Sequence, residues 1–431
     1  MNANEMLKHI KEGGIDNRLL DIYQTEANVR IQSARYTAAV KEFMRIFNHD
    51  TASDVHIFSA PGRTEVCGNH TDHQHGEVLA ASISDDAIAV VTKRDDDAIQ
   101  LLSEGYDMIT IKTSSLEADT GEEGTTKALI RGVLKKFSDN SHAIGGFNAY
   151  ITSDVLSGSG LSSSAAFETI LGTILSGLYN DMSVDPVEIA IIGQYAENVY
   201  FGKPCGLMDQ MACSVGSLCH IDFADPGDPK VSKIDFSLVK AGYSLCITDT
   251  KGSHADLTPD YAAVPAEMKS VAALFGKQVL KEVPEDEIIR NAAMIREKAG
   301  DRAFMRSIHF YEECKRVRLA VKALRDDCFD DFLEIIRESG NSSFKFLQNV
   351  YAPHDLTHQN TSVGLMLSEL TLKNAGNAGA SRIHGGGFAG TIQAFVKNDS
   401  VEVYRKAMDD LFGEGACHVL LIRPFGGVQI I

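Results

Sequence analysis

The hydrophobic and polar positions of this chain follow two periods, and together they predict an α+β protein. Apolar residues at helical spacing form one face within the first 50 residues, at Tyr36, Ala39, Val40, Phe43 and Phe47. Runs with strand character occur at residues 55–60, 87–91, 108–112, 147–152 and 243–248. Longer helices are expected over residues 163–179 and 186–200. The second has Asp185 as a cap, Pro186 at its first position and Glu188 to complete a capping box.

The length of the chain predicts how it is divided. A chain of 431 residues is too long for one ordinary hydrophobic core, so two domains of about 200 residues are expected. We place a helical extension at residues 1–50, a first domain at 51–240 and a second domain at 241–431.

Composition excludes several classes of partner. The formal net charge of −18 argues against nucleic acid and against an anionic membrane surface. No apolar run approaches the roughly 20 residues of a membrane helix, and residues 1–11 lack the apolar core of a signal peptide. The eight cysteines are scattered without a C-x-x-C pair, as expected of reduced thiols. We therefore expect a soluble cytoplasmic protein that acts on a small molecule, as a monomer or a homodimer.

The first candidate for chemistry is the Gly/Ser-rich segment at residues 157–166, where the helix predicted from residue 163 begins. Its small residues let backbone amides approach an anion, and the helix N-terminus offers unpaired N–H groups. Serine hydroxyls could ligate Mg²⁺ or a phosphate oxygen. The Walker A pattern is absent, and a flexible turn before a helix is the competing interpretation.

The second candidate is the dense polar stretch at residues 59–73. It runs from a predicted strand into a loop expected at residues 61–76, a position where ligand sites are common. His70, His73 and the nearby His75 could bind a transition metal together with Asp72. They could also be polar residues of an exposed loop. The residues alone leave both interpretations open.

Two further segments are rich in glycine. The run Gly385, Gly386 and Gly387 lies between a predicted strand and an apolar run. Such a run indicates close backbone packing, either in a tight turn or against a ligand. Asp209 follows a glycine turn at residues 202–206, and a lone aspartate there is usually a helix cap.

In this order and spacing, the four segments and residues 126–133 resemble the galactokinases of the GHMP small-molecule kinase superfamily. The resemblance covers residues 35–431. It implies an N-terminal α/β domain with a left-handed crossover and a C-terminal ferredoxin-like domain, with ATP and sugar in the cleft between them. It also implies transfer of the γ-phosphate of ATP, with Mg²⁺, to the anomeric hydroxyl of galactose or a galactose-like sugar.

The resemblance implies roles for individual residues. Asp209 matches the aspartate beside the anomeric hydroxyl, and Arg63 matches the arginine that pairs with it. Ser163 and Glu197 match the serine and glutamate associated with Mg²⁺. The glycine run at residues 385–387 matches the third GHMP motif. The sugar site falls at Asn69, His70, Asp72, His73 and Tyr261, and the ATP site at Gly158, Ser159, Gly160, Leu161, Ser162, Ser163, Ser164 and Ala165. This assignment replaces the metal interpretation of the histidines.

The chain departs from usual galactokinases at Asn69, where they have Glu, and at His73, where they have Tyr. In the family that glutamate contacts the C6 end of the sugar. Asn69 would therefore remove a repulsion of about 4 kcal/mol toward a substrate carboxylate, at an effective dielectric of about 20. We hypothesise that a C6-altered sugar such as galacturonate or arabinose is accepted, with protonated His73 as a partner, alongside galactose itself. A non-catalytic sugar and ATP sensor is a second hypothesis, and a kinase of a non-sugar alcohol such as mevalonate or homoserine is a third.

Overall fold

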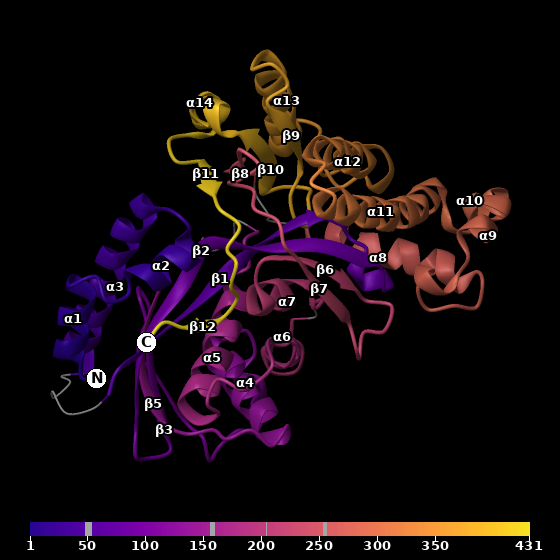
Figure 1. Cartoon of the computed structure of the whole chain (residues 1–431). Coiled ribbons are helices and arrows are strands. Elements are labelled where there is room, and N and C mark those ends of the chain that lie inside the picture. Colours follow the sequence, from indigo (N-terminus) through magenta and orange to yellow (C-terminus); the bar gives the residue numbers. More distant parts are fainter. Residues whose placement is uncertain (48–53, 156–159, 204, 253–256) are drawn as a thin grey trace.

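The computed structural model describes residues 1–47, 54–155, 160–203, 205–252 and 257–431 (Figure 1). The α-helices are α1 (Ala3–Lys11), α2 (Asp16–Tyr23), α3 (Glu26–Phe47), α4 (Thr126–Asp139), α5 (Ser163–Tyr179), α6 (Pro186–Tyr195), α7 (Met208–Val215), α8 (Thr258–Ala273), α9 (Glu285–Arg290), α10 (Ala292–Ala299), α11 (Asp301–Arg325), α12 (Phe329–Ser342), α13 (Asn360–Asn374) and α14 (Val401–Phe412). The strands are β1 (His56–Cys67), β2 (Glu77–Lys93), β3 (Ala98–Ser103), β4 (Ile109–Lys112), β5 (Phe147–Ser153), β6 (Leu218–Asp222), β7 (Lys230–Ile234), β8 (Tyr243–Asp249), β9 (Gly379–Ile383), β10 (Thr391–Lys397), β11 (Cys417–Leu420) and β12 (Val428–Gln429). Short 3-10 turns are η1 (Asp72–Gln74), η2 (Thr120–Glu122), η4 (Leu280–Glu282) and η6 (Asn398–Ser400), and π-helical turns are η3 (Ala196–Phe201) and η5 (Ser343–Leu347).

The larger sheet lies between two layers of helices (Figure 1). Within the described residues it has eight strands in the order β12-β1-β2-β5-β3-β4, with β6 and β7 attached beside β2. Strands β1 and β2 are antiparallel, with Phe58 opposite Ala89. Because successive strand side chains point to opposite faces, Ile57 and Ile88 pack against α1–α3. Phe58 and Ala89 instead pack against α4–α6.

The smaller sheet is formed by the second half of the chain. Its order is β11-β8-β10-β9, and all of its neighbouring strands are antiparallel. With the helices between β8 and β9 and with α14 before β11, the chain follows the β-α-β-β-α-β order of a ferredoxin-like unit. The expected α+β class and ferredoxin-like second half are therefore confirmed. The limits of the predicted domains stay a prediction, and β12 returns from the second half to pair with β1.

Several predicted elements are present with the expected ends. Helix α5 spans the residues predicted for it, and the first 47 residues form α1–α3. Asp185 caps α6 by accepting a hydrogen bond from the Val187 N–H at 2.7 Å. The capping box is wrong, however, because the Glu188 carboxylate instead contacts Asn140 and His142, each at 2.8 Å. Glu188 therefore bonds to residues that follow α4 and not to the backbone at the start of its own helix.

The loop expected from residue 61 is also wrong in its first part. Strand β1 continues to Cys67, with irregular register between Pro61 and Arg63 and again between Glu65 and Cys67. Polar residues indicated a loop, but Arg63 and Glu65 are buried and paired inside the protein. A charged side chain can be buried without water when it is paired with a group of opposite charge.

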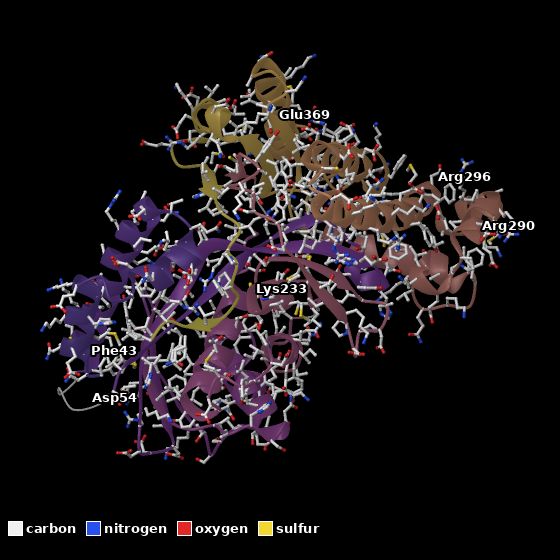
Figure 2. The ribbon with its side chains drawn as sticks, in the orientation of Figure 1. Phe43, Asp54, Lys233, Arg290, Arg296 and Glu369 are labelled. Atoms are coloured by element: carbon white, nitrogen blue, oxygen red, sulfur yellow. The ribbon has the colours of Figure 1, made fainter. Side chains whose placement is uncertain are left out.

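Figure 2 shows the side chains on the same ribbon. Phe43 of α3 is buried, whereas Arg290, Arg296 and Glu369 lie on the outside of the second half. No helix in the part of the chain that the structure describes has the length and apolarity to cross a membrane.

Candidate active site

The centre of the candidate site is an arginine–carboxylate pair between β1 and the first turn of α7. Arg63 Nε donates to Asp209 Oδ1 at 2.7 Å, and Arg63 Nη2 donates to Asp209 Oδ2 at 2.6 Å. The Arg63 side chain is 8% exposed and that of Asp209 is 32% exposed. This two-pronged geometry fixes the carboxylate and leaves one side of it accessible.

The surroundings of Asp209 favour its ionised form. Burial acts to raise the pKa of Asp209, but the charge and hydrogen bonds of Arg63, aided by Ser162, outweigh it and hold the pKa below its ordinary value. The N-terminus of α7 adds the positive end of a helix dipole. At neutral pH Asp209 is therefore a carboxylate that can accept a hydrogen bond or a proton from a hydroxyl group.

The predicted ATP segment meets this pair in its middle, at residues 160–162. Arg63 Nη1 donates to the Gly160 carbonyl, and the Arg63 N–H donates to the Leu161 carbonyl at 3.0 Å. The Ser162 hydroxyl donates to Asp209 Oδ2, and α5 begins at the next residue. Gly158 and Ser159 lie outside the described residues. The structure thus brings residues 160–162, the helix N-terminus and the ion pair to one place.

A cavity beside the start of α5 has a volume of about 480 Å³, which is in the range of small-molecule sites. Ser163 and Ser164 line it together with three aromatic side chains, Tyr106, Phe167 and Phe201. Sequence reasoning missed these aromatic residues, because none of them belongs to a glycine-rich or polar motif. The signal that could have found the cavity was the segment at residues 126–133, since residue 126 also lines it.

Glu197 has a partner at each carboxylate oxygen, but two residues around it each carry a buried oxygen that has no partner in the described part of the chain. Its Oε2 accepts from Gln210 Nε2 at 2.8 Å, and its Oε1 pairs with Lys203 Nζ at 3.0 Å. Among the described residues, Glu168 Oε1 and Gln210 Oε1 are buried without a hydrogen-bond partner. Burial, and then the charge of Glu197, raises the pKa of Glu168 well above its ordinary value. Within those same residues no cluster of three or more His, Cys, Asp or Glu has metal-binding geometry.

Three of the five predicted sugar residues contact the glycine run at residues 385–387. Asn69 Nδ2 donates to the Gly385 carbonyl at 2.7 Å, and His70 Nε2 lies 2.9 Å from the Gly386 carbonyl. The Tyr261 hydroxyl donates to the Gly387 carbonyl at 2.8 Å. A side chain at Gly387 would place its Cβ 2.1 Å from the Asn349 carbonyl oxygen, so this approach requires glycine.

Asn69 lies in the wall of the site and is fully buried. Its Nδ2 also donates to Glu65 Oε1 at 3.1 Å, and its Oδ1 accepts from Asn349 Nδ2 at 2.7 Å. These contacts occupy the Asn69 amide, and a contact between Asn69 and the C6 end of a sugar stays a prediction. Asn349 and Glu65 were missed, because their importance follows only from their contacts with Asn69.

Of the two remaining sugar residues, Asp72 lies near Asp209, and burial shifts the pKa of both Asp72 and His73. A Cβ at Gly206 would lie 2.3 Å from Asp72 Oδ2, so Asp72 packs against the segment that leads into α7. Burial raises the pKa of Asp72. Burial, and then the charge of His70, lowers the pKa of His73 well below its ordinary value, so His73 is neutral at pH 7. The hypothesis of a protonated His73 is therefore not supported.

Comparisons with known proteins agree with this geometry. Residues 128–217 match the family of GHMP kinases N terminal domains, and residues 41–93 match the galactokinase galactose-binding signature. The chain is 31% identical over 358 residues to a galactokinase of Streptomyces coelicolor, covering 83% of this chain and 88% of the relative. It is also 31% identical to a galactokinase of Glaesserella parasuis, covering 82% of this chain and 88% of that protein.

Solved structures show the same likeness in three dimensions. The crystal structure of Lactococcus lactis galactokinase complexed with galactose superimposes with a TM-score of 0.76 at 25% identity, covering 91% of this chain and 99% of that one. A mevalonate kinase structure superimposes with a TM-score of 0.59 at 15% identity, covering 85% and 99% of the two chains, which shows a shared fold alone.

Proposed function

The chain belongs to the galactokinase family of GHMP kinases, and on that premise we propose that it transfers the γ-phosphoryl group of ATP to the anomeric hydroxyl of galactose. One observation supports this most directly. Arg63, Ser162 and Asp209, from three distant parts of the chain, meet at the N-terminus of α5. A phosphate-binding helix terminus and an ionised carboxylate then lie side by side, as phosphoryl transfer to a hydroxyl requires.

The proposed step needs little covalent chemistry from the protein. The anomeric oxygen forms a bond to the γ-phosphorus while the bond from that phosphorus to the β,γ-bridging oxygen breaks, and ADP leaves. Asp209 accepts the proton of the anomeric hydroxyl and passes it to solvent. Arg63 keeps Asp209 ionised. It also adds positive charge beside the transferring phosphoryl group, and because its side chain is only 8% exposed, water screens that charge little.

The nucleotide would lie along α5. We assign its base to the aromatic-lined cavity at Tyr106, Phe167 and Phe201, and its phosphates to the amides around Ser163. Ser163 and Glu197 would hold Mg²⁺, which neutralises phosphate charge when it is bound. The unpartnered oxygens of Glu168 and Gln210 suit a hard cation or its water ligands, because such cations prefer oxygen.

The contacts of Asn69 favour galactose over a C6 acid as the substrate. Asn69 is fully buried and donates toward the Glu65 carboxylate, so its amide is already engaged and a negative charge remains nearby. Neutral His73 adds no positive partner for a substrate carboxylate. Galacturonate and arabinose remain outcomes of the substrate test, and a non-catalytic sensor remains an outcome of the turnover test.

The eight cysteines are free, which fits the proposal of a reducing, cytoplasmic compartment.

A coupled assay of ADP release tests the proposal. The purified protein with ATP and Mg²⁺ is given galactose, galacturonate, arabinose, galactosamine or N-acetylgalactosamine. We expect turnover with galactose, preferred over galacturonate by about 100-fold or more in kcat/KM. Tight galactose and ATP binding without ADP release would instead identify a sensor, and faster turnover of another sugar would reassign the substrate.

A further inference from the structure

We propose that Glu65 and Asn69 act as one positioning unit for the sugar side of the site. Glu65 carries the negative charge, and Asn69 links it to the glycine run at residues 385–387. The inference rests on the proposed galactose kinase activity and concerns residues that do not touch the sugar. Glu65 is 3% exposed and Asn69 is 0% exposed, so both act through the groups that they hold.

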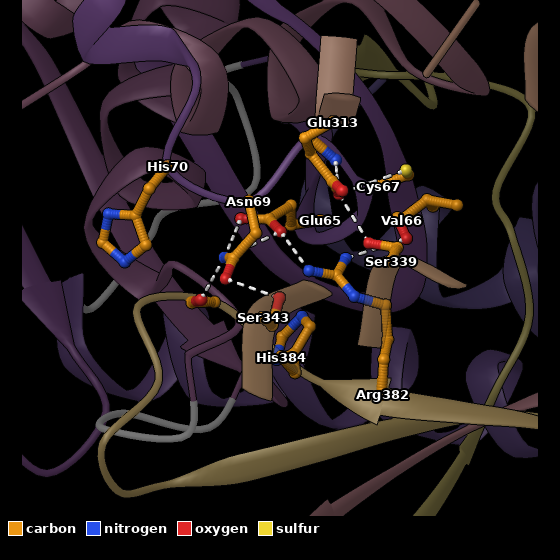
Figure 3. Close-up of polar contacts among 12 residues, drawn as sticks. Glu65, Val66, Cys67, Asn69, His70, Glu313, Ser339, Ser343, Arg382 and His384 are labelled. Atoms are coloured by element: carbon orange, nitrogen blue, oxygen red, sulfur yellow. Dashed lines mark hydrogen bonds and ion pairs between the residues drawn. The ribbon is translucent and has the colours of Figure 1, made fainter. Parts of the chain in front are cut away.

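Every hydrogen-bonding position of the Asn69 amide is used. Figure 3 shows its contacts with Glu65 and Ser343. Its Nδ2 has two donors, and they reach Glu65 Oε1 at 3.1 Å and the Gly385 carbonyl at 2.7 Å. Its Oδ1 accepts from Asn349 Nδ2 at 2.7 Å and from Ser343 Oγ at 3.4 Å. A carboxylate has no donor for the first two partners, so position 69 requires an amide as long as Glu65 is ionised.

The charges around Asn69 are balanced as the chain stands. Glu65 pairs with Arg382 at 3.1 Å, and Glu313 pairs with Arg316 at 2.7 Å. His309 lies 3.0 Å from the Asn69 carbonyl, and burial lowers the pKa of His309 to about 4, so it is neutral at pH 7. Two carboxylates therefore face two guanidinium groups, and a further charge at position 69 would be buried without a partner.

Asn69 can affect the sugar contacts because it shares the glycine run at residues 385–387 with two predicted sugar residues. Asn69, His70 and Tyr261 contact three consecutive carbonyls, those of Gly385, Gly386 and Gly387. Moving the first contact shifts the segment against which the other two side chains rest. The nucleotide cavity contains none of these residues, so the effect should fall on the sugar and spare ATP.

This unit gives a physical reason for the departure at position 69. The negative charge that usual galactokinases carry at that position stands at Glu65 here, within 3.3 Å of Asn69 Nδ2 through either oxygen. Two carboxylates at this separation would repel each other in a low-dielectric setting. Asn69 therefore serves as the hydrogen-bond donor to Glu65, and its presence does not indicate space for a larger or charged group on the sugar.

A double-mutant cycle with isosteric changes tests the unit. Asn69→Asp places two carboxylates together, Glu65→Gln places two amides together, and Glu65→Gln/Asn69→Asp restores one of each. We expect Asn69→Asp to lower kcat/KM for galactose by about 100-fold, chiefly through the KM for galactose. The double variant should recover about tenfold of that loss, because the donor–acceptor pair between positions 65 and 69 and the charge balance return, while the hydrogen bond to the Gly385 carbonyl stays lost.

The KM for ATP separates positioning from a general loss of structure, since we expect it to change much less than the KM for galactose in all three variants. Asn398→Asp is the matched control, because it makes the same chemical change at an exposed contact with Ser244. It should leave both KM values unchanged.

Three results would overturn the unit. These are a wild-type galactose KM in Asn69→Asp, equal rises in both KM values, or a double variant as impaired as the two single changes combined. If Asn69→Asp does not fold, a folded double variant supports the unit and an unfolded one refutes it. Wild-type protein that releases no ADP with galactose would reject the proposed function, while the thermal unfolding midpoints of the four proteins still measure the coupling.

Discussion

Two arginine–carboxylate pairs have different surroundings, one with Arg63 of β1 as a member and the other in contact with Ser59 of β1. In one, Arg63 binds Asp209 at 2.6 Å, and the carboxylate side chain is 32% exposed. In the other, Arg423 binds Asp86 at 2.8 Å, and both side chains are fully enclosed. Burial acts to raise the pKa of each aspartate, yet the arginines hold both pKa values below the ordinary value. Both carboxylates are therefore ionised at neutral pH.

The pairs differ in how many partners surround the carboxylate. Asp86 also receives hydrogen bonds from Arg35 at 2.5 Å, from the Tyr23 hydroxyl at 2.6 Å and from the Ser59 hydroxyl. It thereby joins the helical extension, β1 and the returning C-terminal segment, and its fully enclosed side chain cannot be reached by a substrate. The comparison shows that an arginine keeps a carboxylate charged, while enclosure decides whether that charge is available for chemistry.

The largest expected effect is the loss of turnover in Asp209→Asn. Removing the proposed proton acceptor should lower kcat by about 100-fold or more, and galactose binding should persist. Turnover is measured by ADP release and binding by calorimetry, with the thermal unfolding midpoint as a check on folding. Near-normal kcat would refute the assignment of Asp209.

The same chemical change at Asp86 should lower stability and leave kcat near wild type, the reverse of the effect expected at Asp209. Asp86→Asn leaves Arg35 and Arg423 without their buried countercharge, so the free energy of unfolding should fall by about 3 kcal/mol. The kcat of the folded fraction should stay near wild type, because Asp86 is enclosed away from substrate. A large loss of kcat with unchanged stability would contradict the comparison.

A smaller loss is expected when only the helical extension is detached from Asp86. Arg35 also lies 3.1 Å from Asp154, and its side chain is 14% exposed. Arg35→Met should lower the free energy of unfolding by about 1–2 kcal/mol, because Arg423 still balances Asp86. Arg45→Met is the matched control on the same helix, and its exposed pair with Glu42 predicts no measurable change in the unfolding midpoint. Equal effects of the two changes would show that Arg35 is not a special contact.

The smallest effect is a gain in stability that depends on pH. Burial, and then the charges of Asp154 and Asp86, raises the pKa of Asp85 to about 7. This folded pKa lies above the unfolded value of about 3.9, so ionised Asp85 is destabilising above pH 7 and the cost disappears as pH falls toward 4. Asp85→Asn should therefore stabilise the protein at pH 8 by on the order of 1 kcal/mol, with the gain shrinking at pH 5. Unfolding curves at both pH values test this, and a gain that does not depend on pH would reject the raised pKa.

Local patterns in the sequence determined the α+β class, helix α5, the cap of α6 and the motifs that identify the family. These features depend on residues close together in the chain, where spacing and side-chain chemistry carry the information. The same patterns led us to expect a loop at residues 61–67, because buried pairing of Arg63 and Glu65 is invisible to a local reading.

Only the tertiary structure decided which partners Asn69 has and which aromatic residues line the cavity beside α5. The hydrogen bond from Asn69 to Gly385 joins residues 316 positions apart, and Arg423 reaches Asp86 over 337 positions. Such contacts follow from how the two sheets and the helical extension pack, and no spacing along the chain encodes them. A buried polar side chain takes its function from its partners, and folding supplies those partners.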